Sequence, residues 1–128
     1  MSKSAVTTSN APAPVGGAPY NQAIVANGLV FVAGQVALKP GGSALVADDV
    51  TGQAEQVFDN LAAILEAAGS SLENTVKATV FLSDMTNFAA VNAVYAARMP
   101  EPFPARSAFA VKELPMGALV EIEVIATA

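Results

Sequence analysis

Charged side chains that could do chemistry gather towards the end of the sequence. Arg106 is one of only six basic residues and lies in an otherwise uncharged stretch, residues 103–111. Glu121 and Glu123 occur two residues apart in an apolar run, so in a strand both carboxylates point to one face, about 7 Å apart. A guanidinium can hold a small carboxylate through two parallel hydrogen bonds, and paired carboxylates can do acid–base work. A structural ion pair between Arg106 and a glutamate, or a solvated strand face, is the alternative interpretation.

Three further residues have the character of a binding site. Tyr20 and Asn92 carry polar tips in otherwise apolar surroundings, although such side chains are often hydrogen-bonded core residues. Gly34 interrupts the apolar run 29–35, which predicts a bulge or a close approach by a ligand or another backbone, unless a glycine is merely tolerated near a strand end.

The composition excludes several classes of site. The 128 residues include no His, no Cys and no Trp. Zinc, copper, haem and iron–sulfur sites built from the usual nitrogen and sulfur ligands are therefore excluded, as are cysteine nucleophiles and Ser-His-Asp triads. The net charge of −5 and the lack of a basic run argue against nucleic acid as the main partner.

Hydropathy bears on compartment and association. The longest clearly apolar part, residues 29–33, has the length of a strand and not of a membrane span, and the start of the sequence lacks the apolar core of a signal peptide. We therefore expect a cytoplasmic protein with no membrane partner.

The hydrophobic content of 53% is high for a small domain, which has much surface to cover. An oligomer that buries apolar faces is the favoured explanation, and an unusually apolar monomer is the alternative.

Periodicity and turn signals indicate the elements that must position these residues. Alternating and β-branched runs predict strands, and apolar residues at helical spacing predict helices. Asn27-Gly28 predicts a tight hairpin turn, Asp48 or Asp49 a helix start, and Gly69 a helix end. The predicted strands are 22–26, 29–35, a short one at 45–46, 75–82, 106–112 and 119–126, and the predicted helices are 50–68 and 86–99.

The order of these elements predicts one domain of the α+β class over residues 1–128. Two helices on one face of a mixed sheet would form two layers, and the other face of the sheet would lack a cover within the chain. Residues 1–15, rich in Ser, Thr, Ala and Pro, are expected to be loosely ordered.

The C-terminal segments 104–115 and 120–123, which contain Arg106 and Glu121, resemble the signature of the Rid family (YjgF-type proteins, reactive intermediate imine deaminases). Nearly the whole chain takes part in this resemblance, because further segments match the family in the same order. These are residues 10–12, 18–20, 33–35, the helix 53–69, 76–82 and 88–92.

The resemblance implies a chorismate-mutase-like α+β fold that assembles as a homotrimer with clefts between subunits. The implied activity is hydrolysis of small 2-imino acids or their enamine tautomers to 2-oxo acids and ammonia. The substrates would be 2-aminoacrylate, 2-iminopropanoate and 2-iminobutanoate, reactive intermediates released by pyridoxal-phosphate enzymes. The deaminase itself would need no cofactor and no metal.

The resemblance also implies residue roles. Arg106 matches the family arginine that binds the substrate carboxylate, and Glu121 matches the glutamate placed near the hydrolytic water. Ala108 stands where many members carry Cys, so a thiol is not available there. The implied substrate-binding positions are Tyr20, Gly34, Asn92 and Ala108.

Two alternative functions remain open at the level of sequence. The same cleft could sense 2-oxo or amino acids without turnover, as a binding or regulatory module. RNA cleavage or translation inhibition, a role attached to some relatives, is disfavoured by the net charge of −5 and the lack of His, since a ribonuclease needs cations for phosphate and a group that titrates near neutrality.

Overall fold

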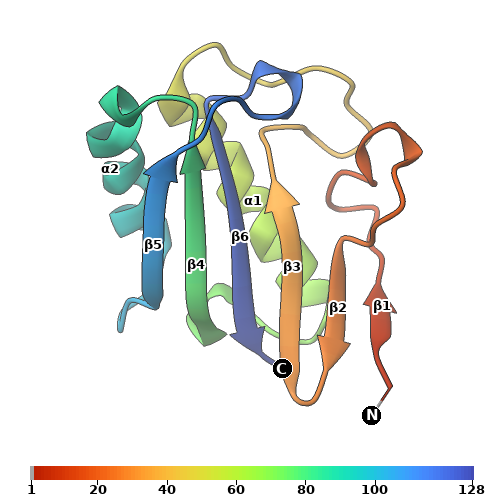
Figure 1. Cartoon of the computed structure of the whole chain (residues 1–128). Coiled ribbons are helices and arrows are strands. Elements are labelled where there is room, and N and C mark those ends of the chain that lie inside the picture. Colours follow the sequence, from red (N-terminus) through yellow and green to blue (C-terminus); the bar gives the residue numbers. More distant parts are fainter. Residues whose placement is uncertain (1) are drawn as a thin grey trace.

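A six-stranded sheet with two helices against one of its faces makes up the chain (Figure 1). The structure is a computed structural model and describes residues 2–128. The strands are β1 (Ser4–Val6), β2 (Ala23–Ala26), β3 (Leu29–Gln35), β4 (Thr75–Leu82), β5 (Ala105–Ala110) and β6 (Val120–Thr127), and the helices are α1 (Val50–Ala67) and α2 (Phe88–Arg98).

The strand order across the sheet is β1-β2-β3-β6-β4-β5. All neighbours pair antiparallel except β4 and β5, which pair in parallel. A parallel pair needs a crossover connection, and α2 supplies it. The last strand, β6, lies between β3 and β4 in the middle of the sheet (Figure 1). The sheet is therefore mixed, and the chain is a single α+β domain, as the sequence predicts.

Local signals in the sequence set the limits of α1. Asp49 caps its start, because its carboxylate accepts a hydrogen bond from the Gly52 N–H at 3.0 Å. Beyond its end, Gly69 adopts a positive φ of 79°, a conformation that glycine takes without steric penalty. The predicted hairpin turn is also confirmed, since Asn27 and Gly28 both have positive φ between the paired strands β2 and β3.

The two faces of the sheet differ. Residues such as Val80, Ile122 and Val124 point to the helices and are almost fully buried. On the opposite face, which we call the open face, Phe31 and Phe109 remain 41% and 45% exposed. This face has no cover within the part of the chain that the structure describes, in agreement with the prediction of a bare sheet face.

The expectation that the N-terminal segment is loosely ordered was wrong. Ser4–Val6 forms β1, which pairs with β2, although residues 1–15 were expected to be loose. The buried Gln22 side chain holds the segment that follows β1, by bonding to Thr8 and to the carbonyls of Ala11 and Pro12. Composition did not indicate this order because it comes from pairing with a distant strand.

The predicted strand at residues 45–46 is also absent; the Val46 N–H donates one hydrogen bond to the Ala37 carbonyl, within a loop. The predicted helix 86–99 begins instead as a short 3-10 turn, Met85–Asn87, with Asp84 as its cap. Over residues 2–128, no helix is both long and apolar enough to cross a bilayer.

Candidate active site

A pocket of about 380 Å³ lies where the N-terminal loop meets the ends of β3 and β6. It brings together Tyr20, Gly34 and Glu121, three of the residues that the sequence singles out; we call these the acidic half-site. Apart from Tyr20 and Glu121, the lining is neutral and mostly apolar. It consists of Val15, Ala18, Ala33, Gly34, Val36 and Pro115.

The predicted irregularity at Gly34 is confirmed. The register between β3 and β6 shifts between Val32 and Gln35, so β3 bulges there. The buried Gln35 amide supports the bulge by donating to the Ala33 carbonyl at 3.2 Å. A Cβ added at Gly34 would overlap Oε2 of Glu121. Glycine is therefore required for the Glu121 carboxylate to lie against this backbone.

The Tyr20 hydroxyl is fixed by the backbone. The Val15 N–H donates to its oxygen at 2.8 Å, and positive φ angles at Gly16 and Gly17 shape the turn between the two residues. The hydroxyl proton of Tyr20 is donated to no acceptor among residues 2–128. A phenol is both donor and acceptor, so this proton is available to a ligand in the pocket.

Glu121 is an unusual carboxylate for this protein. It is half-buried, whereas Glu123 two residues later is exposed. Burial raises the pKa of the Glu121 carboxyl above its ordinary value, and the negative charge of Glu123 raises it further. A carboxylate with a raised pKa accepts a proton more readily near neutral pH. Glu121 is thus suited to take a proton from a water molecule.

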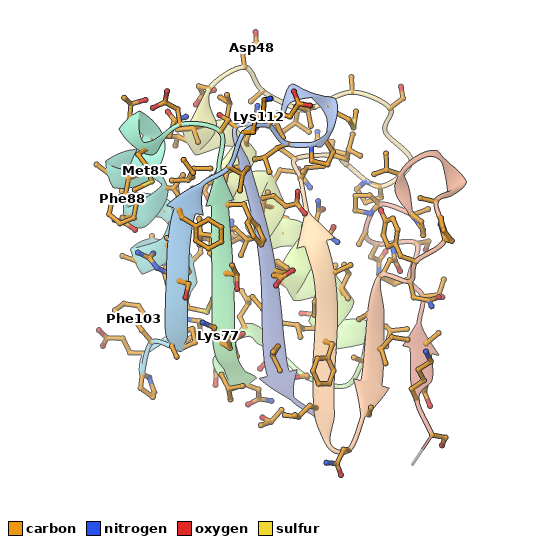
Figure 2. All side chains as sticks on the ribbon, viewed as in Figure 1. Asp48, Lys77, Met85, Phe88, Phe103 and Lys112 are labelled. Carbon is orange, nitrogen blue, oxygen red and sulfur yellow. The ribbon has the colours of Figure 1, made fainter. Side chains whose placement is uncertain are left out.

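Arg106 lies away from this pocket, against α2. Its Nη1 donates to Oδ1 of Asn92 at 2.8 Å, and its Cζ lies 4.8 Å from the centre of the Tyr95 ring and 5.7 Å from that of Phe88. Figure 2 shows Phe88 on α2, beside β5. Ala108 is two residues further along β5 and therefore on the same face. We call Asn92, Arg106 and Ala108 the arginine half-site.

The structure shows no structural ion pair for Arg106 within one chain. Over residues 2–128, both ion pairs belong to Arg98, which contacts Glu55 at 2.8 Å and Asp59 at 2.7 Å. No carboxylate of the described chain lies within salt-bridge distance of Arg106. The guanidinium is also only partly buried. It is a cation with free donors that an external anion can reach.

The two half-sites lie on opposite faces of the sheet within one chain. Arg106 is paired in register with Ala78, whose side chain is buried on the helix face. Glu121 is paired with Phe81, whose ring packs on that of Phe109 on the open face. Side chains of directly paired residues point the same way. One chain therefore does not bring Arg106 and Glu121 together.

Sequence reasoning missed the aromatic residues under Arg106 and the pocket wall formed by Val15 and Pro115. Phe88, Asn92 and Tyr95 follow a spacing of four and then three residues, which places them on one helix face; a polar residue in the middle of an aromatic stripe was the available signal. Within residues 2–128, no cluster of three or more His, Cys, Asp or Glu side chains could hold a metal ion.

Comparison with known proteins adds to this geometry. The sequence profile of the family described as Endoribonuclease L-PSP matches residues 8–128. The chain belongs to this family, the Rid family of the sequence analysis. This Rid-family chain is 51% identical over 128 residues to a RutC family protein of Synechocystis sp., covering 98% of this chain and 97% of that protein.

Two further relatives carry more specific names. The 2-iminobutanoate/2-iminopropanoate deaminase of Capra hircus is 43% identical over 121 residues, covering 94% of the Rid-family chain and 87% of the deaminase. The crystal structure of RidA from the Antarctic bacterium Psychrobacter sp. superposes with a TM-score of 0.92 at 43% identity, covering 98% of this chain and 99% of that one. The fold of this Rid-family chain is thus the fold of RidA.

Proposed function

We propose that this chain hydrolyses small 2-imino acids to 2-oxo acids and ammonia, in sites assembled from the half-sites of two copies. The observation that carries the proposal is the presence, in one chain, of two complementary groups. The partly exposed Arg106 guanidinium has no ion-pair partner among residues 2–128, and the half-buried Glu121, whose pKa is raised, lines a neutral pocket. The name of the goat relative, an imine deaminase at 43% identity, supports the same reaction.

A 2-imino acid carries a carboxylate next to an electrophilic C=N carbon. Arg106 binds the carboxylate through two parallel hydrogen bonds and thereby orients that carbon. The Glu121 carboxylate accepts a proton from water as the water oxygen bonds to the carbon and the C=N π electrons move to nitrogen. Glu121 passes this proton to the nitrogen, which gives a carbinolamine. Glu121 then takes the carbinolamine hydroxyl proton and delivers it to the amino group, so that the C–N bond breaks and ammonia leaves as the C=O bond forms. The net reaction consumes one water and no other reactant.

The pocket lining favours small, uncharged substrate side chains. Val15, Val36 and Pro115 offer apolar surface in a volume of about 380 Å³. A second carboxylate on the substrate would be repelled by the negative charge of Glu121. Glu121 is half-buried, and two like charges repel more strongly there than in bulk water. Imines with methyl or ethyl side chains fit this chemistry, and imines of acidic amino acids do not.

The same geometry supports an assembly of several copies. Because Arg106 and Glu121 face opposite sides of one sheet, both can reach a single small substrate only if they come from different copies. The exposed aromatic rings of the open face, Phe31 and Phe109, supply apolar surface for association. We therefore propose a homotrimer, the state implied by the family resemblance, with one site between each pair of subunits.

The word endoribonuclease in the description of the matching family names a different reaction. A net charge of −5 and the lack of His in this chain disfavour a phosphate-binding surface and a general base titrating near neutrality. We do not assign RNA cleavage to this chain.

The experiment supplies 2-aminoacrylate from a serine dehydratase and follows the appearance of pyruvate with and without the chain. We expect the parent to accelerate release and Arg106→Ala and Glu121→Gln to lose this effect. Co-expressing the two inactive variants should then restore about a quarter of the parent activity, since a site with both functional halves forms only when the halves come from different variants.

The turnover assay and the co-expression assay can each contradict the proposal. If the parent binds 2-oxobutyrate but does not accelerate release, the chain is a binding protein and not an enzyme. If the parent is active but co-expression restores nothing, the site is not shared between copies.

A further inference from the structure

We propose that Tyr95 is a positioning residue for the arginine half-site. Its ring forms a shelf that fixes the plane of the Arg106 guanidinium, with Phe88 as a secondary wall, so that the free edge of the cation is presented to a substrate carboxylate. The inference rests on the proposed function of Arg106 as the carboxylate-binding group.

The first support is the position of the cation over the rings. The guanidinium carbon lies 4.8 Å from the Tyr95 ring centre and 5.7 Å from that of Phe88. Both distances lie within the range of a cation–π contact, which reaches to about 6 Å. The Asn92 carbonyl oxygen accepts from Nη1 at 2.8 Å. One helix face thus contacts the guanidinium through two rings and one hydrogen bond.

The second support is the count of donors. A guanidinium has five N–H donors in a rigid fork and no acceptor. Among residues 2–128, the Asn92 side chain accepts a hydrogen bond from Nη1 of Arg106. The remaining guanidinium N–H groups of Arg106 donate to no other side chain or carbonyl of residues 2–128. A contact with a ring face leaves the edge of the guanidinium free, and the edge is the part that binds a carboxylate in two-point fashion.

The third support is the rigidity of Tyr95. The residue is only 5% exposed. Phe58 packs edge-on to its ring at 5.8 Å between centres, and Phe103 approaches it at 6.4 Å. In contrast, the Tyr95 hydroxyl is buried with no hydrogen-bond partner among the described residues. Tyr95 therefore contacts Arg106 through its ring, and its hydroxyl makes no hydrogen bond within residues 2–128.

The test compares Tyr95→Phe, which keeps the ring, with Tyr95→Leu, which keeps apolar bulk but removes the π face. The readouts are the Kd for 2-oxobutyrate by calorimetry, and KM and kcat with a 2-imino acid. We expect Tyr95→Leu to raise Kd and KM about tenfold with a smaller change in kcat, and Tyr95→Phe to stay within about twofold of the parent. Phe88→Leu, at the longer distance, should raise Kd less than Tyr95→Leu.

The matched control is Val94→Ala. Val94 is on the same helix and is also 5% exposed, but it precedes Tyr95 by one residue and so lies about 100° around the helix axis. Its substitution destabilises the same helix without touching the shelf, so Kd should stay at the parent value while the melting temperature falls. An equal rise in Kd for Val94→Ala and Tyr95→Leu would mean that Tyr95 acts through general packing, and would overturn the proposal.

Two more variants separate this inference from the proposed function. If Arg106→Lys keeps the parent Kd, the carboxylate role of Arg106 fails and the shelf has nothing to position. If Arg106→Lys loses affinity but Tyr95→Leu does not, the shelf alone is wrong. In the double variant, Tyr95→Leu should add little to the loss caused by Arg106→Lys, because the two residues act as one unit. If Tyr95→Leu does not fold, an unchanged Kd in Phe88→Leu overturns the proposal.

Discussion

Two glutamates on one strand face differ in environment, and therefore in expected chemistry. Glu121 is half-buried in the pocket and Glu123 is exposed beside it. We expect Glu121→Gln to lose about 10²–10⁴-fold in turnover, the usual contribution of a general base. Glu123→Gln should retain most activity but move the acidic limb of kcat/KM to lower pH, because it removes one of the two causes that raise the pKa of Glu121. A pH–rate profile of both variants on one substrate checks this, and equal losses would contradict it.

The raised pKa of Glu121 also has a consequence for stability. An acid whose pKa is higher in the folded state contributes stability below its unfolded pKa, and this contribution is lost as the pH rises through the folded pKa. At pH 7 the ionised, half-buried Glu121 therefore lowers the free energy of unfolding. Glu121→Gln should melt at an equal or higher temperature than the parent at pH 7, an advantage that disappears below about pH 4. Scanning calorimetry at both pH values measures it, and a lower melting temperature at pH 7 counts against a desolvated carboxylate.

Gly34 provides a third test at the scale of one residue. In Gly34→Ala the new Cβ displaces the Glu121 carboxylate, which is the mobile partner of the overlap. We expect turnover to fall about tenfold or more, because misplacement of about 1 Å at a reacting group has effects of that size or larger, while the melting temperature changes little. In a Glu121→Gln background the same substitution should add almost nothing. A full further loss there would assign Gly34 a role that is independent of Glu121.

The sequence singles out the residues proposed for the site, but it does not predict how they are arranged. Arg106 is a single cation in an uncharged stretch, Glu121 is a carboxylate in an apolar run, and Gly34 interrupts an apolar strand. That Arg106 and Glu121 face opposite sides depends on the register of β5 against β4 and of β4 against β6. Register is set by packing over the whole sheet, and short-range patterns do not encode it.

At the scale of elements, strong local periodicity gave the most accurate predictions. The strand 75–82 agrees with β4 to the residue, because it alternates and is β-branched. The helix 50–68 has a cap and a regular apolar stripe and is one residue longer than α1. In contrast, β1 has three residues and a weak pattern of its own, and its order comes from pairing with β2. The false strand at 45–46 has the right residue types but no partner strand.

The segment between β1 and β2 depends on one side chain. Gln22 is 3% exposed and bonds at once to Thr8, Ala11 and Pro12. Gln22→Leu would leave these buried polar groups without partners, and we expect a loss of about 2–3 kcal/mol in the free energy of unfolding. Urea denaturation measures it. Gln56→Leu, which removes a single bond to Asn60, is the control and should cost less than about 1 kcal/mol. Equal losses would mean that Gln22 is not a specific anchor.

At the scale of the whole molecule, the open face predicts association. We expect sedimentation equilibrium at micromolar concentration to give three times the chain mass of 12.9 kDa. The reason is that exposed apolar rings on the open face favour association, and that the proposed site needs residues from a second copy. Phe31→Asp, which places a charge on that face, should weaken the assembly and lower activity in parallel. A monomer mass for an active parent would remove the oligomer and the shared site together.

The central place of β6 has a consequence for how the chain is made. Among the described strands β6 is translated last, yet it joins β3 to β4. A nascent chain that lacks β6 therefore has two sheet segments, β1 to β3 and β4 to β5, with no strand pairing between them, although α1 packs on α2. Neither segment can complete the sheet before β6 leaves the ribosome. Stalled chains that end before Val120 should be cut by protease throughout, whereas released full-length chains should resist. Loss of residues from β6 would then act as a folding defect of the entire domain, and Glu121 is translated after every other residue of the candidate site.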